Sequence, residues 1–598
     1  MKTEWNLDPI YKGLEDPNYE ADVRKAEELV AEYSQLVDEA QKAANKTAET
    51  EDSASEKTGV EAYVEKLLLL EEALTLKIYN LSLYLELRQS VDQENGDVMA
   101  QNNRIMKIMS AAAPATAAAD KIYAKIADID ALAGKSEVVK AYVFKLKNAK
   151  ENAKHLLSDD VEEMISAMDM TGGSAWGQLQ SFLTSVVRVE YEGKTVTLSE
   201  IRNLAYDQDA AVRKAAYEAE IACYEKIQDA IAFSLNNIKN QVTMVSEKRG
   251  YESPLAMTLK QSRMTKETLD AMLGAIREYL PVFRKYLRKK AEMLGHENGL
   301  PWYELFAPLG SSERKFSVEE ARDYLVTCFE KFSPDCAELM QEAFDNEWID
   351  FFPRKGKRGG AFCAGVLGTS QSRILTNFDG NFGAVSTLAH ELGHAYHNRQ
   401  TEENRVLNQD YSMPVAETAS TFNETHLGHF ALASATPEEK LSLLENDLME
   451  KTQCIVDIYS RYLFETAVFE QSQTKFLMAE DLKTLMLQAQ KEAYGDGLDE
   501  NVMHPYMWAC KGHYYSSGLS FYNFPYAFGN LFAVGLYNMF LEEGASFVPK
   551  YKAMLKATPT CTIEEAGAMV GVNLSDKKFW EGSLKLIAKD IEEFCALS

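Results

Sequence analysis

Long amphipathic helices dominate the pattern of this sequence. Between Tyr63 and Gln89 leucines recur at helical spacing, and they are Leu67, Leu70, Leu74, Leu81 and Leu85. Such a stripe is typical of the packing faces in a helix bundle. Glycine and proline, which interrupt helices, number only 32 and 15 among 598 residues. The sequence therefore predicts a mostly α-helical fold.

A few segments interrupt the helical pattern. Thr171-Gly-Gly173 predicts a break, and Pro114 predicts the start or the break of a helix. The alternation from Val186 to Leu198, around Glu192-Gly-Lys194, predicts a β-hairpin. We place a domain boundary there, with an N-terminal helical lobe over 1–195 and a larger lobe over 196–598. Short apolar runs between turn residues over 361–380 predict a small sheet.

Charge and composition exclude several classes of protein. Lys and Arg total 63 against 91 Asp and Glu, a net charge of −28, so we expect no nucleic-acid partner and no anionic membrane partner. The most apolar stretch, Phe524 to Phe540, contains Asn530 and Asn538 and predicts a buried core helix. No secretory signal starts the sequence, and its eight cysteines form no CxxC pair, so we predict a cytoplasmic location.

The strongest chemical signal is His390-Glu-Leu-Gly-His394, an HExxH motif. Residues four apart lie on one face of a helix, so both imidazoles can bind one cation, and neutral ring nitrogens suit zinc. Glu391 is rotated by about 100° around the axis and reaches a zinc-activated water as its general base. The alternative is a surface helix whose two histidines are solvated.

Three other histidines are poor candidates for the third zinc ligand. His397 lies on the same face as His390, but about 10.5 Å along the axis, so it cannot share the ion. We expect His397 to be a polar lining or surface residue. Its presence, with Gln400, also excludes the extended HExxHxxGxxH pattern. His426 and His429 could compete as ligands, but we interpret both as structural.

Two glutamates are better candidates for that ligand. Ser412 and Pro414 predict a helix start, which would place Glu417 and Glu424 on one face about 10.5 Å apart. Only one of them can bind the ion, and the other could orient a ligating histidine. Spacing alone does not choose between them, nor does it exclude that both are solvated.

The combination HELGHAYH and MPVAETASTFNE resembles the oligoendopeptidase F group of the thimet-oligopeptidase-like zinc peptidases. EWNLDPIY, RGYESPLAM, KRGGAFCAG and GLSFYNFPYAFG are similar to further blocks of that family. The resemblance implies that Glu417 is the third ligand and that Glu424 supports the site. It also implies a two-lobed helical zincin-type body with a deep substrate channel and a small β-sheet near the active site.

The resemblance assigns roles to two further segments. It implies that Tyr522, Tyr526 and His513 stabilise the oxyanion of the tetrahedral intermediate, although the spacing from His513 differs from that in mammalian-type relatives. It implies that the backbone of Gly359, Gly360 and Ala361 forms a strand edge that pairs with an extended peptide.

We therefore predict a zinc-dependent endopeptidase that hydrolyses internal bonds of short oligopeptides, with one Zn²⁺ per chain. The alternatives are an exopeptidase of the peptidyl-dipeptidase or carboxypeptidase type on the same fold, and a peptide-binding protein without activity. The sequence does not indicate the oligomeric state, the length limit of the substrates or the preferred side chains.

Overall fold

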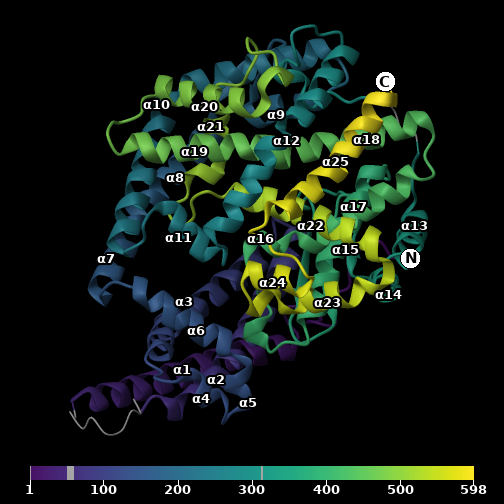
Figure 1. The fold of residues 1–598 in the computed structure, drawn as a ribbon. Helices are drawn as coiled ribbons and strands as arrows, with labels where there is room; N and C mark the ends of the chain where they lie inside the picture. The colour runs from purple at the N-terminus through teal and green to yellow at the C-terminus, as the bar shows by residue number, and fades with distance from the viewer. Residues whose placement is uncertain (1, 50–58, 311–313, 598) are drawn as a thin grey trace. The chain divides into compact units, whose positions relative to one another are not determined.

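The structure, a computed structural model, describes residues 2–49, 59–310 and 314–597 (Figure 1). Over these residues it is mostly α-helical with only small sheets, which confirms the predicted fold class. The chain divides into two compact units. Unit 1 comprises Met1–Leu156, Arg314–Ser412 and Glu543–Val570, and unit 2 comprises Leu157–Glu313, Met413–Glu542 and Gly571–Ser598.

The N-terminal part of unit 1 is a bundle of long helices. They are α1 (Pro17–Glu49), α2 (Glu61–Val91) and α3 (Gly96–Ala124). Leu67, Leu81 and Leu85 are fully buried, so the predicted leucine stripe does form the packing face of α2. A buried carboxylate, Glu71, accepts hydrogen bonds from Tyr123 Oη at 3.0 Å and Lys145 Nζ at 2.8 Å, which offset its burial.

The predicted start or break at Pro114 is wrong, because α3 continues through it. Proline removes one helical hydrogen bond and costs about 3 kcal/mol inside a helix. Alanines surround it, and Ala112, Ala115 and Ala119 are buried against the bundle. The high helix propensity of alanine and this packing keep the two halves in one helix.

The remaining elements of unit 1 surround a small sheet. The helices are α4 (Ile129–Ala133), α5 (Glu137–Ala141), α6 (Val143–Asn152), α13 (Val318–Glu330), α14 (Pro334–Asp345), α15 (Phe382–Thr401), α23 (Val548–Ala557) and α24 (Ile563–Met569). The strands are β3 (Ile349–Asp350), β4 (Phe362–Val366) and β5 (Gln371–Leu375), in the order β3-β5-β4. β4 and β5 pair antiparallel, with Ala364 opposite Arg373, and this confirms the predicted sheet.

Unit 2 consists of helices and one hairpin. Its helices are α7 (Asp159–Thr171), α8 (Gly173–Val186), α9 (Leu198–Asn203), α10 (Ala210–Lys248), α11 (Pro254–Gln261), α12 (Lys266–Met293), α16 (Met413–Ala416), α17 (Thr418–Leu432), α18 (Pro437–Thr452), α19 (Ile458–Ser472), α20 (Ala479–Tyr494), α21 (Met507–Cys510), α22 (Phe524–Glu543) and α25 (Lys577–Leu597). Gly172 separates α7 from α8, which confirms the predicted break.

The predicted hairpin is also confirmed. β1 (Arg188–Tyr191) pairs antiparallel with β2 (Lys194–Thr197). The two residues between them, Glu192 and Gly193, have φ values of 49° and 75°. Positive φ at both central residues is the requirement of the tight turn that matches the twist of two paired strands.

The most apolar stretch of the sequence forms α22, a core helix, as predicted. Leu531, Phe532 and Leu536 are fully buried, and Phe528 packs edge-on against Trp580 of α25 with ring centroids 5.3 Å apart. None of the helices in the described ranges combines the length and the apolar character needed to span a membrane. The boundary at residue 195, the two-lobed body and its channel stay predictions.

Candidate active site

Helix α15 carries the HExxH motif. It begins after Asn381, whose side chain accepts a hydrogen bond from the backbone N–H of Ala384 at 2.7 Å and caps the first turn. Val385, Leu388 and Leu392 are completely buried, and the helix packs against β4, β5 and α23. This packing fixes the rotation of the helix and therefore the direction in which the motif side chains point.

The two histidines of the motif lie side by side. Nε2 of His390 and Nε2 of His394 are 3.2 Å apart, and the two rings are inclined by 79°. Two ligands at about 2.0–2.1 Å from one tetrahedral ion lie roughly 3.3 Å apart, so the separation fits a shared cation. Both rings are partly exposed, whereas Glu391 is buried, with 5 % of its surface exposed.

Glu417 occupies the junction between α16 and α17, so the single helix expected from the sequence is two helices. Its Oε2 accepts a hydrogen bond of 2.8 Å from Oγ of Ser420. A Cβ at Gly529 of α22 would lie 3.3 Å from the Cβ of Glu417, so the glycine allows α22 to approach this carboxylate closely.

One group of acidic, histidine and cysteine side chains among the described residues could hold a metal ion. It consists of His390, His394 and Glu417, whose ligand atoms lie within 4.8 Å of one another. Two imidazole nitrogens and one carboxylate oxygen are a donor set of catalytic zinc, and three protein ligands leave a coordination position open. The residues present therefore fit a zinc ion.

Glu424 follows in α17 and is not a member of that group. It lies near the thiol of Cys454. Burial raises the pKa of Cys454 to about 12, and the carboxylates of Glu450 and Glu424 contribute to the increase. The predicted supporting role of Glu424 stays a prediction.

His513, Tyr522 and Tyr526 come together in unit 2. The ring centroids of His513 and Tyr522 are 5.0 Å apart, and those of Tyr522 and Tyr526 are 5.2 Å apart. Nε2 of His513 lies 3.3 Å from the hydroxyl oxygen of Tyr526. The three side chains thus form one cluster of hydrogen-bonding groups, which we call the His–Tyr cluster.

Burial controls the charge of this cluster. Burial lowers the pKa of His513, and the nearby cations of Arg461 and Lys511 lower it further. Burial and the hydrogen bond with Tyr522 raise the pKa of Tyr526 well above its ordinary value. Near neutral pH the imidazole is therefore uncharged, and the hydroxyl of Tyr526 keeps the proton that it can donate.

A strained turn beside the cluster is held by a buried ion pair. Phe521 has a φ of 53°, which is costly for a bulky residue. Glu465 accepts hydrogen bonds from the backbone N–H of Phe521 at 3.0 Å and from Nδ2 of Asn523 at 2.8 Å. Nζ of Lys239 lies 2.6 Å from the same carboxylate, and the two side chains are 0 % and 1 % exposed.

Sequence analysis missed Glu465 and Lys239. They lie in two separate helices, α19 and α10, where charged residues ordinarily mark a solvated face. No motif or spacing distinguishes them, because these two residues pair with each other across 226 positions of the chain.

Gly359, Gly360 and Ala361 lie just before the edge strand β4, which begins at Phe362. Nδ2 of Asn377 donates a hydrogen bond of 2.8 Å to the carbonyl oxygen of Gly360 and holds this bend. The edge of β4 itself is partly covered, because Tyr79 of α2 donates a hydrogen bond of 3.0 Å to the carbonyl oxygen of Gly365. Pairing of this edge with a peptide stays a prediction.

The expectation that His397 lines the site or the surface is wrong. Its side chain is fully buried, stacks on Tyr411 with ring centroids 4.0 Å apart, and lies 2.9 Å from Oγ1 of Thr558. Burial lowers its pKa to about 3. His426 and His429 both contact the ring of Tyr537, as their structural interpretation requires.

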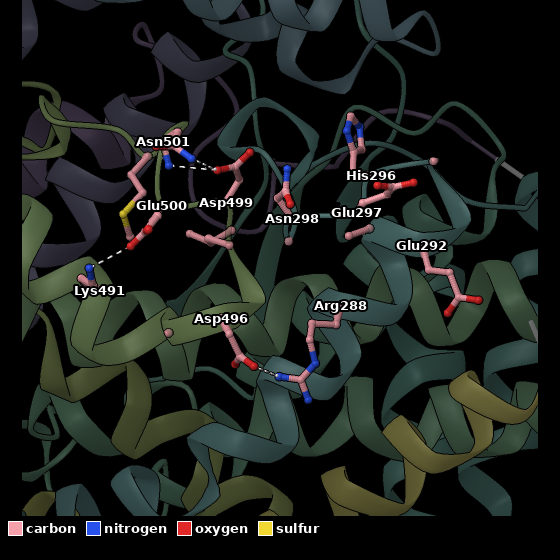
Figure 2. A pocket seen from close by; sticks show the side chains of 16 residues that line it. Arg288, Glu292, His296, Glu297, Asn298, Lys491, Asp496, Asp499, Glu500 and Asn501 are labelled. Carbon is pink, nitrogen blue, oxygen red and sulfur yellow. Dashed lines mark hydrogen bonds and ion pairs between the residues drawn. The ribbon is translucent and has the colours of Figure 1, made fainter.

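A cavity of about 1090 Å³ lies at the end of α12 and contains none of the predicted site residues (Figure 2). Two ion pairs lie among its charged side chains, Arg288 with Asp496 at 2.6 Å and Lys491 with Glu500 at 2.9 Å. The pairs are exposed, so this cavity offers neither the burial nor the convergent groups of an active site.

Comparisons with known proteins find matches over most of the chain. A family model described as peptidase family M3 matches residues 203–586, and one described as oligopeptidase F matches residues 124–188. The Oligopeptidase PepF of Bacillus subtilis (strain 168) is 25 % identical over 542 residues, which cover 88 % of this chain and 80 % of that protein. The resemblance seen in the sequence is thereby confirmed.

Solved structures show the same fold. A crystal structure from Chlamydophila abortus, described as that of a peptidase, has a TM-score of 0.83 at 19 % identity and covers 100 % of this chain and 98 % of its own. The crystal structure of oligoendopeptidase-F from Enterococcus faecium has a TM-score of 0.69 at 18 % identity and covers 96 % and 99 %.

Proposed function

The chain belongs to peptidase family M3, and on that premise we propose that it is a zinc-dependent endopeptidase that hydrolyses internal bonds of short peptides. The names of its relatives, Oligopeptidase PepF and oligoendopeptidase-F, support oligopeptides as substrates. The observation that carries the proposal is the group of His390, His394 and Glu417, whose ligand atoms lie within 4.8 Å of one another.

His390, His394 and Glu417 would hold the zinc ion. When bound, zinc lowers the pKa of water and polarises a carbonyl group. Glu391, the residue after His390, takes the proton from the attacking water on its carboxylate and delivers it to the nitrogen of the leaving amine.

The His–Tyr cluster would stabilise the oxyanion that forms when water adds to the peptide carbonyl. Its hydroxyl groups and its imidazole are donors that are already positioned before the reaction, and each such donor contributes about 3–4 kcal/mol. The raised pKa of Tyr526 supports the role, because the hydroxyl stays protonated at neutral pH.

The other predicted features belong to the same proposal. Glu424 would support the ligands, and the bend at Gly359–Ala361 with strand β4 would align the peptide backbone. We retain residues 1–195 and 196–598 as the proposed domains. A cytoplasmic location is proposed as well.

The test is cleavage of an internally quenched peptide with both ends blocked, together with elemental analysis of the purified chain. We expect about one zinc per chain, loss of cleavage on chelation and recovery on addition of zinc. Cleavage of free-ended peptides only would establish the exopeptidase alternative. Zinc-free protein that binds peptides without cutting them would establish the binding protein.

A further inference from the structure

A cavity of about 490 Å³ in unit 2 is lined by an unusual number of cations for so acidic a chain. Its basic side chains are Arg202, Arg213, Arg461 and Lys511. Glu220 is the one acidic residue among those that line it. Composition alone would predict the opposite sign of charge, so the cations are concentrated here.

The three arginines of the cavity are each paired with a carboxylate. In each pair, Nε of the arginine lies 2.7–3.2 Å from a carboxylate oxygen. The pairs are Arg202 with Glu220, Arg213 with Glu304, and Arg461 with Asp457. Asp457 belongs to the π-helical turn Gln453–Asp457, and such turns are frequent at functional sites. These pairs fix the arginine side chains, so the wall of the cavity is preorganised.

Lys511 differs from the three arginines. Its side chain is partly buried, and among the described residues its ammonium group has no ion pair like those of the arginines, although the charge of Asp457, the partner of Arg461, also acts on it. Burial lowers the pKa of Lys511, and the guanidinium of Arg461 lowers it further. The cavity thus contains one positive charge more than its paired carboxylates balance, and an anionic ligand would supply the missing charge.

This cavity adjoins the His–Tyr cluster. Lys511 directly precedes the short helix Gly512–Tyr515, which carries His513. Arg461 and Lys511 are also the two cations whose charges act on His513. Aromatic rings form another part of the wall, and Tyr206 and Phe306 pack with centroids 4.9 Å apart. A ligand here would therefore combine an anionic group with an apolar part.

We propose that this cavity binds a carboxylate of the peptide substrate and that Lys511 is the residue that recognises it. The proposal rests on the proposed function, since it concerns the substrate of the same site. Two carboxylates of a peptide have this chemistry, the C-terminal carboxylate and the side chain of Asp or Glu. A charge-assisted hydrogen bond to the ammonium would hold either of them.

The experiment measures binding separately from cleavage. Zinc-loaded Glu391→Gln protein, which binds without turnover, is titrated with a fluorescently labelled peptide that ends in a free carboxylate, in an amide, or in an amide preceded by Glu. The same peptides are titrated into the Lys511→Met and Lys511→Arg variants in that background. Lys491→Met is the matched control, because that exposed lysine is in unit 2 and outside this cavity.

We expect the free acid to bind about tenfold more tightly than the amide, and Lys511→Met to reduce this ratio to about one. Lys511→Arg and Lys491→Met should keep the ratio. Recovery of tight binding by the amide that contains Glu would assign the cavity to an acidic side chain, which also supports the proposal. Equal affinity of Glu391→Gln protein for the acid and the amide would overturn it, as would an equal loss of affinity for both peptides in Lys511→Met.

Failure of the proposed function has a different signature. In that case the parent enzyme cleaves none of these peptides even when it contains zinc. The difference in affinity between acid and amide does not depend on turnover, so it decides the role of Lys511 in either case.

Discussion

Removing the buried carboxylate of Glu465 should destabilise unit 2 and impair the turn that carries Tyr522. Glu465→Gln keeps the shape of the side chain but leaves the ammonium of Lys239, which is 0 % exposed, without its counter-charge. Loss of one partner from a buried ion pair costs about 3–5 kcal/mol. Taken for unfolding of the whole chain in one transition, an unfolding entropy of about 2.1 cal/mol/K per residue gives roughly 1.3 kcal/mol/K for 598 residues. The expected drop in Tm is therefore about 2–4 °C.

Scanning calorimetry of three variants tests this reasoning. Lys239→Met should cost less than Glu465→Gln, because the carboxylate keeps its hydrogen bonds from Phe521 and Asn523. The double variant Lys239→Met/Glu465→Gln removes both charges and should melt above Glu465→Gln alone. A double variant that melts at the sum of the two single losses would refute the electrostatic explanation.

The same variants should also affect catalysis. Phe521 holds a φ of 53° only because its surroundings fix it, and Glu465 supplies one of the hydrogen bonds that do so. Weakening that anchor displaces Tyr522, so kcat should fall more than KM rises. An unchanged kcat in Glu465→Gln would show that this ion pair has no effect on catalysis.

Three further outcomes test the site, and a fourth tests the buried His397. Glu391→Gln should keep zinc but lose far more than tenfold in kcat, and a smaller loss, below about 1.4 kcal/mol, would contradict its role as base. Glu417→Ala should lower the zinc content measured by elemental analysis more than Glu424→Ala does, and the reverse order would make Glu424 the ligand. Tyr526→Phe should reduce kcat about 10²–10³-fold with little change in KM, as expected when a donor to the oxyanion is lost. Burial lowers the pKa of His397 to about 3 in the folded chain. As pH falls, the histidine of the unfolded chain therefore binds a proton at a higher pH than that of the folded chain, so stability is lost between about pH 6.5 and pH 3. His397→Gln should flatten the dependence of Tm on pH in that window.

Local sequence patterns predicted much of this fold. The leucines of α2, the break at Gly172, the hairpin around Glu192 and Gly193, and the core helix α22 all follow from periodicity or turn chemistry. Each depends on residues that are close along the chain. Pro114 shows the limit of such rules, because packing against neighbouring helices outweighs its local cost.

The candidate site also combines features that the sequence predicts locally with features that depend on distant residues. The pairing of His390 with His394 is local, since a spacing of four residues in one helix brings their rings together. The fully buried His397, three residues further on, could not be distinguished from an exposed histidine, because burial depends on Tyr411 and Thr558. The sequence also left Glu417 and Glu424 as alternatives on one expected helix, whereas Glu417 ends up at a junction between two.

What the sequence determined by itself is therefore the helical class, the short-range elements and the motif whose spacing defines a metal-binding helix face. Only the tertiary structure joined Lys239 to Glu465, and it alone placed Lys511 in a cavity with three paired arginines. The physical reason is the range of the interactions. Helix and turn signals act over a few residues, whereas a buried charge is stabilised by whichever distant side chain the packing brings to it.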